Sequence, residues 1–371
     1  MEKHKPAPGE TKQEPHSEDG GSPERADKSS ANKREWSPTN IFLRDYSVRE
    51  QIEGAAAVEI DGERVKVVDI SPEKLKTETP LLVAPGWAAT PKFLQDNIEG
   101  FVRGDGAGGR RTLCLDTPHG VDLRGAQGGS SISRTAARRK VGQVSRQETA
   151  EDYLTEETIS EAELRKVAAA VKVMEEKGIS QVDVVAHSEA GINMLLAAAL
   201  YPEKFRNIVL VNPAGLMKKD NTAALATRFS YDNVRRTLAE VASGFPGGKR
   251  FAQRTNTAGL EIIKSVAKNP LRSLKEVVAI ANTHTGELID ELKTKGVRVS
   301  IIHTTKDRAF PIQRVKEMAS AREIDEFYTI EGGHGELMLN AEKVTDLADR
   351  ALISMEKKAR MERIKRESEV T

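Results

Sequence analysis

The sequence predicts an α/β protein, because short apolar runs alternate along the chain with segments whose apolar residues recur at helical spacing. Residues 182–185 read Val-Asp-Val-Val, which is typical of a short buried strand, and residues 192–200 form a strong helical pattern soon after it. Residues 57–70 carry alternating apolar residues on both sides of Asp61-Gly62, the strongest short-range signal of a β-hairpin. Further strands are expected at 80–84, 111–117, 205–211, 297–304 and 324–330, and further helices at 93–101, 158–177, 235–243, 271–282 and 340–365.

The composition is that of a soluble protein that carries some disordered sequence. The chain has 371 residues, enough for one large α/β domain or two smaller ones, and its net charge of +1 gives no reason to expect a nucleic acid or an anionic membrane as partner. No apolar run approaches the ~20 residues of a membrane span. The polar N-terminus does not resemble a secretory signal, so a cytoplasmic location is expected. The single cysteine, Cys114, allows no internal disulfide and is expected to be a buried strand residue.

Three segments have polar or glycine-rich sequences. Residues 1–40 contain almost no apolar side chains and are expected to be a disordered tail. Residues 122–155 are longer than most loops, and are either disordered or a functional flap; the basic cluster at 138–140 lacks interleaved aromatic residues, which favours a solvated loop over a nucleic-acid patch. The stretch 104–109 follows a helix and precedes a strand, whereas a dinucleotide-binding loop follows a strand and precedes a helix. No cofactor is therefore expected.

Ser188 stands at the corner between the predicted strand and the predicted helix, in the motif Ala-His-Ser-Glu-Ala-Gly. Such a tight corner requires small residues on both sides of the serine, and it exposes the serine oxygen. The motif resembles the nucleophile elbow of the α/β-hydrolase family, although Ala186 and Ala190 stand where that family usually has glycine. Alanine is the next smallest residue, and Gly191 follows directly. Taken alone, a serine at this place is often only the N-cap of a helix.

The resemblance covers roughly residues 55–351 and implies the fold of the α/β hydrolases. This fold is a doubly wound, mostly parallel sheet of about eight strands with an antiparallel start, and a helical lid is inserted into it. The implied organisation is a disordered tail (1–40), a first part of the hydrolase core (41–215), a helical lid (216–295), a second part of the core (296–355) and a charged C-terminal tail (356–371).

The same resemblance assigns a catalytic triad. Asp307 follows the strand expected before it and shortly precedes a proline, where the family has its acid; His334 follows the last expected strand, where the family has its base. With Ser188 these residues occur in the family's chain order of nucleophile, acid and base. The resemblance also implies an oxyanion hole made of two backbone N–H groups, that of Trp87 in the loop after the strand at 80–84 and that of Glu189 directly after the serine.

The remaining histidines have other expected roles. His187 is expected to point into the structure, His303 to be a satisfied core histidine, and His119 to be structural or to line the pocket, whereas a pocket contact of His284 is left open. The side chain of Glu189 is expected to point to solvent from the start of its helix. No cluster of His, Cys, Asp and Glu has the spacing of a metal site, so no metal is expected.

These residues imply a serine hydrolase that acts through an acyl-enzyme on a small or medium acyl substrate, most simply a carboxylic ester. Thioester, lactone and amide bonds stay open, because this fold carries many activities. The alternative is a protein that keeps the fold and binds a ligand or acts as a scaffold without turnover. The alanines of the elbow, the glutamate beside the serine and the long polar tails are the observations behind that alternative. Protein partners and oligomeric state are left open.

Overall fold

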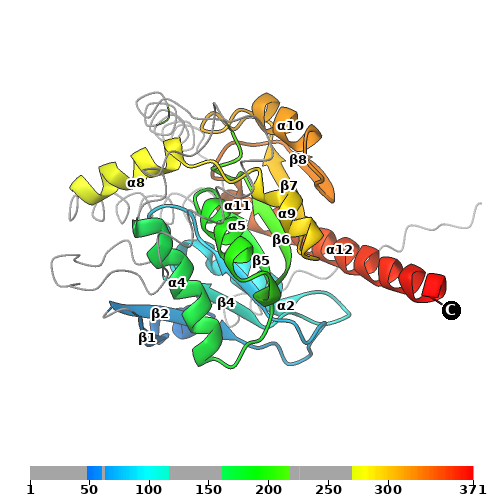
Figure 1. Cartoon of the computed structure of the whole chain (residues 1–371). Coiled ribbons are helices and arrows are strands. Elements are labelled where there is room, and N and C mark those ends of the chain that lie inside the picture. Colours follow the sequence, from blue (N-terminus) through cyan, green and yellow to red (C-terminus); the bar gives the residue numbers. More distant parts are fainter. Residues whose placement is uncertain (1–47, 61–62, 117–160, 218–224, 226–269, 371) are drawn as a thin grey trace, which may run out of the picture. The chain divides into compact units, whose positions relative to one another are not determined.

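An eight-stranded sheet forms the centre of the described part of the protein (Figure 1). The structure is a computed structural model that describes residues 48–60, 63–116, 161–217, 225 and 270–370, all within one compact unit. The strands are β1 (Ala56–Ile60), β2 (Glu63–Ile70), β3 (Leu81–Ala84), β4 (Thr112–Leu115), β5 (Val182–His187), β6 (Phe205–Val211), β7 (Arg298–Thr304) and β8 (Glu326–Ile330).

The strand order is β1-β2-β4-β3-β5-β6-β7-β8. β1 pairs with β2, and β2 with β4, in antiparallel fashion, and every later pair is parallel. This confirms the predicted doubly wound, mostly parallel sheet with an antiparallel start. Because parallel strands end at the same edge of a sheet, the residues that follow β3, β5, β7 and β8 lie at one edge, where ligands bind in open α/β sheets.

Helices cover both faces of the sheet, which explains why the central strands are buried along nearly their whole length and are mainly apolar. The helices with their bounds are η1 (Pro91–Leu94), α2 (Gln95–Arg103), α4 (Glu161–Glu176), α5 (Ala190–Leu200), η2 (Pro202–Lys204), α8 (Pro270–Asn282), α9 (Leu288–Thr294), α10 (Ile312–Ser320), α11 (Glu336–Leu339) and α12 (Ala341–Val370).

Successive residues of β5 belong to the cores on opposite faces of the sheet. Val184 and Ala186 pack in the core with α4, α5 and α9, whereas Val185 packs in the core with α2 and α12. This alternation follows from the two-residue period of a strand. Cys114 in β4 is fully buried, as expected, and burial raises the pKa of its thiol.

Two helices bear on the predicted organisation of the chain. α12 agrees with the helix predicted at 340–365 and runs further, to Val370, and ion pairs from this helix join Glu356 to Arg206 and Glu362 to Arg298. α9 falls inside the range predicted for the lid, yet it packs against α5 and β7 as a helix of the core. The sequence pattern of a helix does not reveal which neighbours it packs against.

Several predictions concern residues outside the described part of the chain. These are the tail at 1–40, the hairpin turn at 61–62, His119, the loop at 122–155, and most of the lid range, namely 218–224 and 226–269 with the helix predicted at 235–243. Among the helices that are described, none has the length and apolarity needed to cross a membrane.

A buried charge cluster holds the start of β5. The carboxylate of Asp183 is fully buried and accepts hydrogen bonds from Arg110 (3.2 Å), Arg206 (2.9 Å) and Asn207 (2.9 Å). Arg206 and Asn207 belong to β6, and Arg110 precedes β4, so this carboxylate joins β5 to β6 and to the segment before β4.

We expect Asp183→Ala to lower the free energy of unfolding by about 3 kcal/mol or more, because it removes a fully buried carboxylate that pairs with the buried Arg110, and the remaining partners of Arg110, Asp349 and Glu356, are partly exposed. Urea unfolding followed by circular dichroism measures this loss. The matched control is Asp346→Ala, which removes an exposed ion pair with Arg350 on α12 and should change the free energy by less than about 1 kcal/mol. Equal effects of the two substitutions would contradict the prediction.

Candidate active site

Ser188 occupies a strained corner between β5 and α5. Its φ angle is 54°, in the left-handed region that non-glycine residues rarely adopt, which costs about 1–2 kcal/mol. Two backbone hydrogen bonds hold the corner: Ser188 N–H donates to Val211 (3.1 Å), and the Ser188 carbonyl accepts from Ala214 N–H (3.0 Å). The end of β6 therefore keeps the serine in this conformation.

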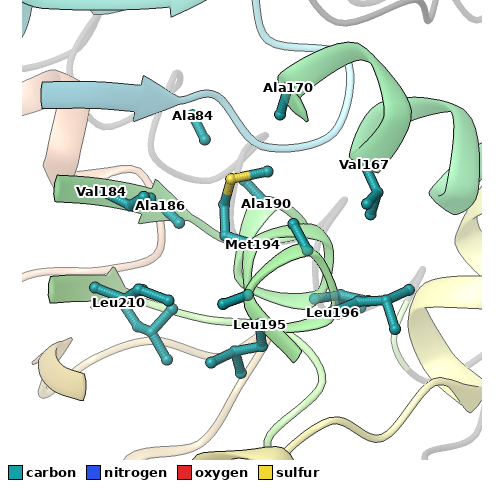
Figure 2. Packing of buried hydrophobic residues seen from close by; sticks show 14 of the residues in the cluster. Ala84, Val167, Ala170, Val184, Ala186, Ala190, Met194, Leu195, Leu196 and Leu210 are labelled. Carbon is teal, nitrogen blue, oxygen red and sulfur yellow. The ribbon is translucent and has the colours of Figure 1, made fainter. Parts of the chain in front are cut away.

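Small residues surround the corner. A methyl group on Gly86 would lie 2.9 Å from the Cβ of Ser188 and 3.0 Å from the carbonyl oxygen of His187, so only glycine fits there. Ala186 and Ala190 are buried among residues of β3, β5, β6, α4 and α5 (Figure 2). The elbow thus forms with alanine at the two positions that usually hold glycine in similar elbows.

The structure brings together Ser188, His334 and Asp307. Nε2 of His334 lies 2.9 Å from Oγ of Ser188, and Nδ1 lies 2.8 Å from Oδ2 of Asp307. All three residues are buried, and they follow β5, β8 and β7 at the same edge of the sheet. An ionised carboxylate only accepts hydrogen bonds, so Nδ1 carries the proton and Nε2 is left to accept one from the serine hydroxyl.

Asp307 is held as a carboxylate. Burial by itself raises the pKa of Asp307, but the charge of His334 and the hydrogen bond to it outweigh burial, so the pKa lies below its ordinary value. The second oxygen, Oδ1, accepts the backbone N–H of Phe310 at 3.0 Å, and the Phe310 ring stands edge-on to the ring of His334 at 5.2 Å. The carboxylate therefore has a fixed orientation and a stable negative charge at neutral pH.

Asn212 connects the loop that carries His334 with the end of β7, which precedes Asp307. Its side-chain NH₂ donates to the carbonyl of His334 (2.9 Å), and its side-chain oxygen accepts the backbone N–H of Thr304 (2.8 Å) at the end of β7. Its φ is 44°, which asparagine tolerates better than most residues. The sequence analysis identified only a strand end here; an asparagine directly after a buried strand and before a proline was the available signal.

His187 contacts the backbone of His334 and lies beside its ring. It is buried as expected, its Nε2 lies 3.1 Å from the carbonyl oxygen of His334, and the two rings are 5.1 Å apart. Burial and the proximity of His334 lower the pKa of His187 to about 3. It is therefore neutral, and its Nε2–H donates to the carbonyl of His334.

Glu189 directly follows the serine, and Trp87 lies in the loop after β3. Trp87 directly follows Gly86, whose backbone touches the elbow. Glu189 is the N-cap residue of α5, so its N–H is among the first in that helix, which have no partner within the helix. The positions are compatible with the expected oxyanion hole.

The expected direction of the Glu189 side chain is wrong. The side chain is 1% exposed, and its Oε1 lies 2.6 Å from Nζ of Lys166, which is buried in α4. The reason is the opposite charge of Lys166, which is buried on the neighbouring helix α4. The expectation rested only on the preference of acidic side chains for the start of a helix, which takes no account of residues on other helices. Lys166 also lies 3.7 Å from Glu276 of α8, and Glu163 is buried one turn away from Lys166.

The sequence analysis missed this cluster. Apolar residues at helical spacing marked one buried face of α4, but Glu163 and Lys166 lie beside that face, and no local pattern distinguishes them from solvated charges.

The other histidines have defined partners. His303 is fully buried, as expected of a core histidine, and its Nε2 lies 2.8 Å from the carbonyl of Phe310. Its Nδ1 has no hydrogen-bond partner among the described residues, so the expectation of a satisfied histidine holds for one ring nitrogen only. His284 lies 3.1 Å from the carbonyl of Gly215 through Nδ1 and 2.6 Å from Glu287 through Nε2. In the part of the chain that is described, no group of three or more His, Cys, Asp or Glu residues could hold a metal ion.

We expect the stability of the protein to fall between about pH 6.5 and pH 3 partly through His187. In this range the unfolded chain binds a proton at this residue, with a pKa near 6.5, whereas the folded chain stays neutral until its pKa of about 3. The free energy of unfolding therefore decreases by at most about 1.4 kcal/mol per pH unit as pH falls.

Urea unfolding at a series of pH values, compared between the wild type and His187→Gln, measures this contribution. The variant should show a shallower slope, although some slope remains because burial also lowers the pKa of His303. Parallel slopes in the two proteins would rule out the contribution of His187.

Comparison with solved structures finds the same fold at low sequence identity. An enol-lactonase from Burkholderia xenovorans LB400 aligns with a TM-score of 0.53 at 12% identity, covering 80% of this chain and 99% of its own. An esterase from Exiguobacterium antarcticum aligns with a TM-score of 0.53 at 14% identity, covering 80% and 99%. A bromoperoxidase from Bacillus anthracis aligns with a TM-score of 0.51 at 16% identity, covering 80% and 99%.

No curated protein matches the sequence. A family model does match it: the model of the alpha/beta hydrolase fold aligns with residues 117–340, which is more than half of the chain. The matched range contains Ser188, Asp307 and His334. The chain therefore belongs to the alpha/beta hydrolase fold family.

Proposed function

We propose that this protein is a serine hydrolase that cleaves a small or medium acyl substrate, most simply a carboxylic ester, through an acyl-enzyme. The observation that carries the proposal is the continuous chain from Ser188 Oγ through His334 to Asp307, with contacts of 2.9 Å and 2.8 Å. These distances are within hydrogen-bond reach for both proton transfer and orientation of the base.

In the first half-reaction His334 takes the hydroxyl proton of Ser188 as the serine oxygen attacks the carbonyl carbon. Asp307 stabilises the resulting imidazolium, because its carboxylate is ionised and already faces Nδ1. His334 then gives the proton to the leaving group, and an acyl-enzyme is formed. In the second half-reaction a water molecule loses a proton to the same nitrogen and attacks the carbonyl carbon of the acyl-enzyme. The bond between this carbon and Oγ of Ser188 then breaks, His334 returns the proton to Oγ, and the acid is released.

The tetrahedral intermediates carry a negative charge on the former carbonyl oxygen. The backbone N–H groups of Trp87 and Glu189 are our candidates for stabilising that charge. Glu189 is at the positive end of α5, and Trp87 is in the loop whose glycine packs against the elbow. A donor of this kind contributes roughly 3 kcal/mol to transition-state stabilisation in comparable sites.

The range 216–295, apart from α9, is our candidate for a lid. Its α8 reaches the site, since Glu276 accepts a hydrogen bond from the Trp87 indole N–H at 2.9 Å. Support for ester chemistry comes from structural neighbours described as esterases and an enol-lactonase, at identities of 12–14%. Ester and lactone bonds have the same carbonyl electrophile, so both belong in the first substrate panel.

We expect Ser188→Ala to lose labelling by a fluorescent fluorophosphonate and to lower kcat for p-nitrophenyl esters by at least about a thousandfold. Loss of the hydroxyl removes the nucleophile, whereas the fold should persist because alanine fits the same corner. The matched control is Ser180→Ala, an exposed serine before β5, which should label as the wild type does. A folded wild type that neither labels nor turns over any ester, thioester, lactone or amide would contradict the proposed function.

We expect Asn212→Ala to lower kcat by roughly tenfold to a hundredfold, since a displacement of about 1 Å in a catalytic group has an effect of this size. The substitution removes the link between the loops of His334 and Thr304. Asn207→Ala is the matched control, because it removes a buried asparagine near the start of β6, whereas Asn212 directly follows the end of that strand. The control should lower stability and leave kcat per folded molecule unchanged; an equal kcat in both variants would argue against a positioning role of Asn212.

A further inference from the structure

A cluster of buried charges lies directly beside the nucleophile. It consists of Glu163 and Lys166 on α4, Glu189 at the start of α5 and Glu276 on α8, and we call it the α4 charge cluster. The ammonium of Lys166 lies 2.6 Å from Glu189 and 3.7 Å from Glu276, and its side chain is 2% exposed. Buried ion clusters are costly to form, so their position next to a reactive serine requires an explanation.

Both residues assigned to the oxyanion hole are attached to this cluster. Glu189 is attached through its own carboxylate, which pairs with Lys166. Trp87 is attached through its indole N–H, which donates to Oε2 of Glu276 at 2.9 Å, while Oε1 of Glu276 faces Lys166. A single ammonium therefore connects the side chains of the two residues whose backbone N–H groups would bind the oxyanion.

We propose that Lys166 is a positioning residue for the oxyanion hole, and that it fixes the two N–H donors by holding Glu189 directly and Trp87 through Glu276. This inference rests on the proposed function. It assigns Lys166 no contact with substrate. Its role is to keep both donors aimed at one point, since the contribution of a preorganised donor depends on its not having to reorganise during the reaction.

The electrostatics of the cluster explain why the arrangement is rigid. Burial alone disfavours a charged lysine, but the carboxylates of Glu189 and Glu276 outweigh it and raise the pKa of Lys166, so the ammonium is kept. Burial and the negative charge of Glu189 raise the pKa of Glu163 well above its ordinary value, so Glu163 holds a proton. Two carboxylates therefore face one ammonium in a low dielectric, where a side chain that turned away would leave a buried charge uncompensated.

A purely structural role is the competing explanation. The cluster joins α4, α5 and α8, and it could hold these helices together without affecting the reaction. The two explanations predict different kinetics. A structural role lowers stability and the fraction of folded protein, whereas a positioning role lowers kcat per active site and weakens binding of the tetrahedral adduct, with little change in KM.

The test compares Lys166→Met with the wild type in the full-length protein. Methionine keeps much of the length of the side chain and removes its charge. Active sites are counted by fluorophosphonate titration, kcat and KM are measured with a p-nitrophenyl ester, and the Ki of a trifluoromethyl ketone reports binding of an oxyanion. We expect kcat to fall about tenfold or more and Ki to rise by a similar factor, with KM changed less than about twofold.

Two further variants sharpen the comparison. Lys166→Arg keeps the positive charge and should recover part of the kcat that Lys166→Met loses. Lys172→Met is the matched control, because Lys172 lies on the same helix but is exposed and pairs only with Glu175 and Glu176 among the described ion pairs. It should have wild-type kcat and Ki.

Trp87→Phe keeps the test decisive if Lys166→Met does not fold. This substitution removes the indole N–H that Glu276 binds and keeps an aromatic ring and the backbone N–H. It should lower kcat and raise Ki in the same proportion, with a smaller change than Lys166→Met because the link to Glu189 remains. Wild-type kcat and Ki in a folded Lys166→Met, or in Trp87→Phe when the first variant does not fold, would overturn the inference while the proposed function stood. A folded wild type without hydrolysis or labelling would overturn both.

Discussion

The left-handed backbone of Ser188 is the constraint on which the rest of the site depends. A residue with φ of 54° does not hold this conformation by itself, and the structure supplies the missing stability from β6, through hydrogen bonds that involve Val211 and Ala214. The same strand end carries Asn212, which reaches the loop of His334 and the end of β7. The strained corner, the loop of His334 and the end of β7 therefore share one support, and the parallel register of β5, β6 and β7 places the ends of these strands side by side.

Buried ion pairs stand at both ends of β5. At the start of the strand Asp183 forms ion pairs with Arg110 and Arg206, at the opposite end of β5 from Ser188. Arg110 also pairs with Glu356, so these charges connect the sheet with α12. Beyond the end of the strand Glu189 neutralises Lys166. Each site stabilises the protein only as a complete set, since removal of one member leaves a buried charge. At the second site the same rigidity reaches the proposed active site, because one member of the set, Glu189, directly follows Ser188.

The fold was largely predictable from local patterns, and the reason is periodicity. The apolar runs at 80–84, 205–211 and 297–304 are strands that are buried on both faces, which gives a signal that needs no knowledge of neighbours. The limits of this reasoning are visible at α9 and α12. Both have helical patterns, but whether such a helix belongs to a lid, a core or a tail depends on the elements it packs against, and those contacts are not encoded in its own spacing.

By itself the sequence determined the α/β class, the strand-serine-helix corner, and the chain order of Ser188, Asp307 and His334, because each depends on residues that are adjacent or regularly spaced. Only the tertiary structure decided which polar side chains meet. Trp87 and Glu276 are 189 positions apart, and Lys166 and Glu189 lie on different helices. An acidic side chain at the start of a helix usually points to solvent, but the side chain of Glu189 points inward because it pairs with the buried ammonium of Lys166. A charge is solvated or buried according to what surrounds it in space, and folding alone brings those surroundings together.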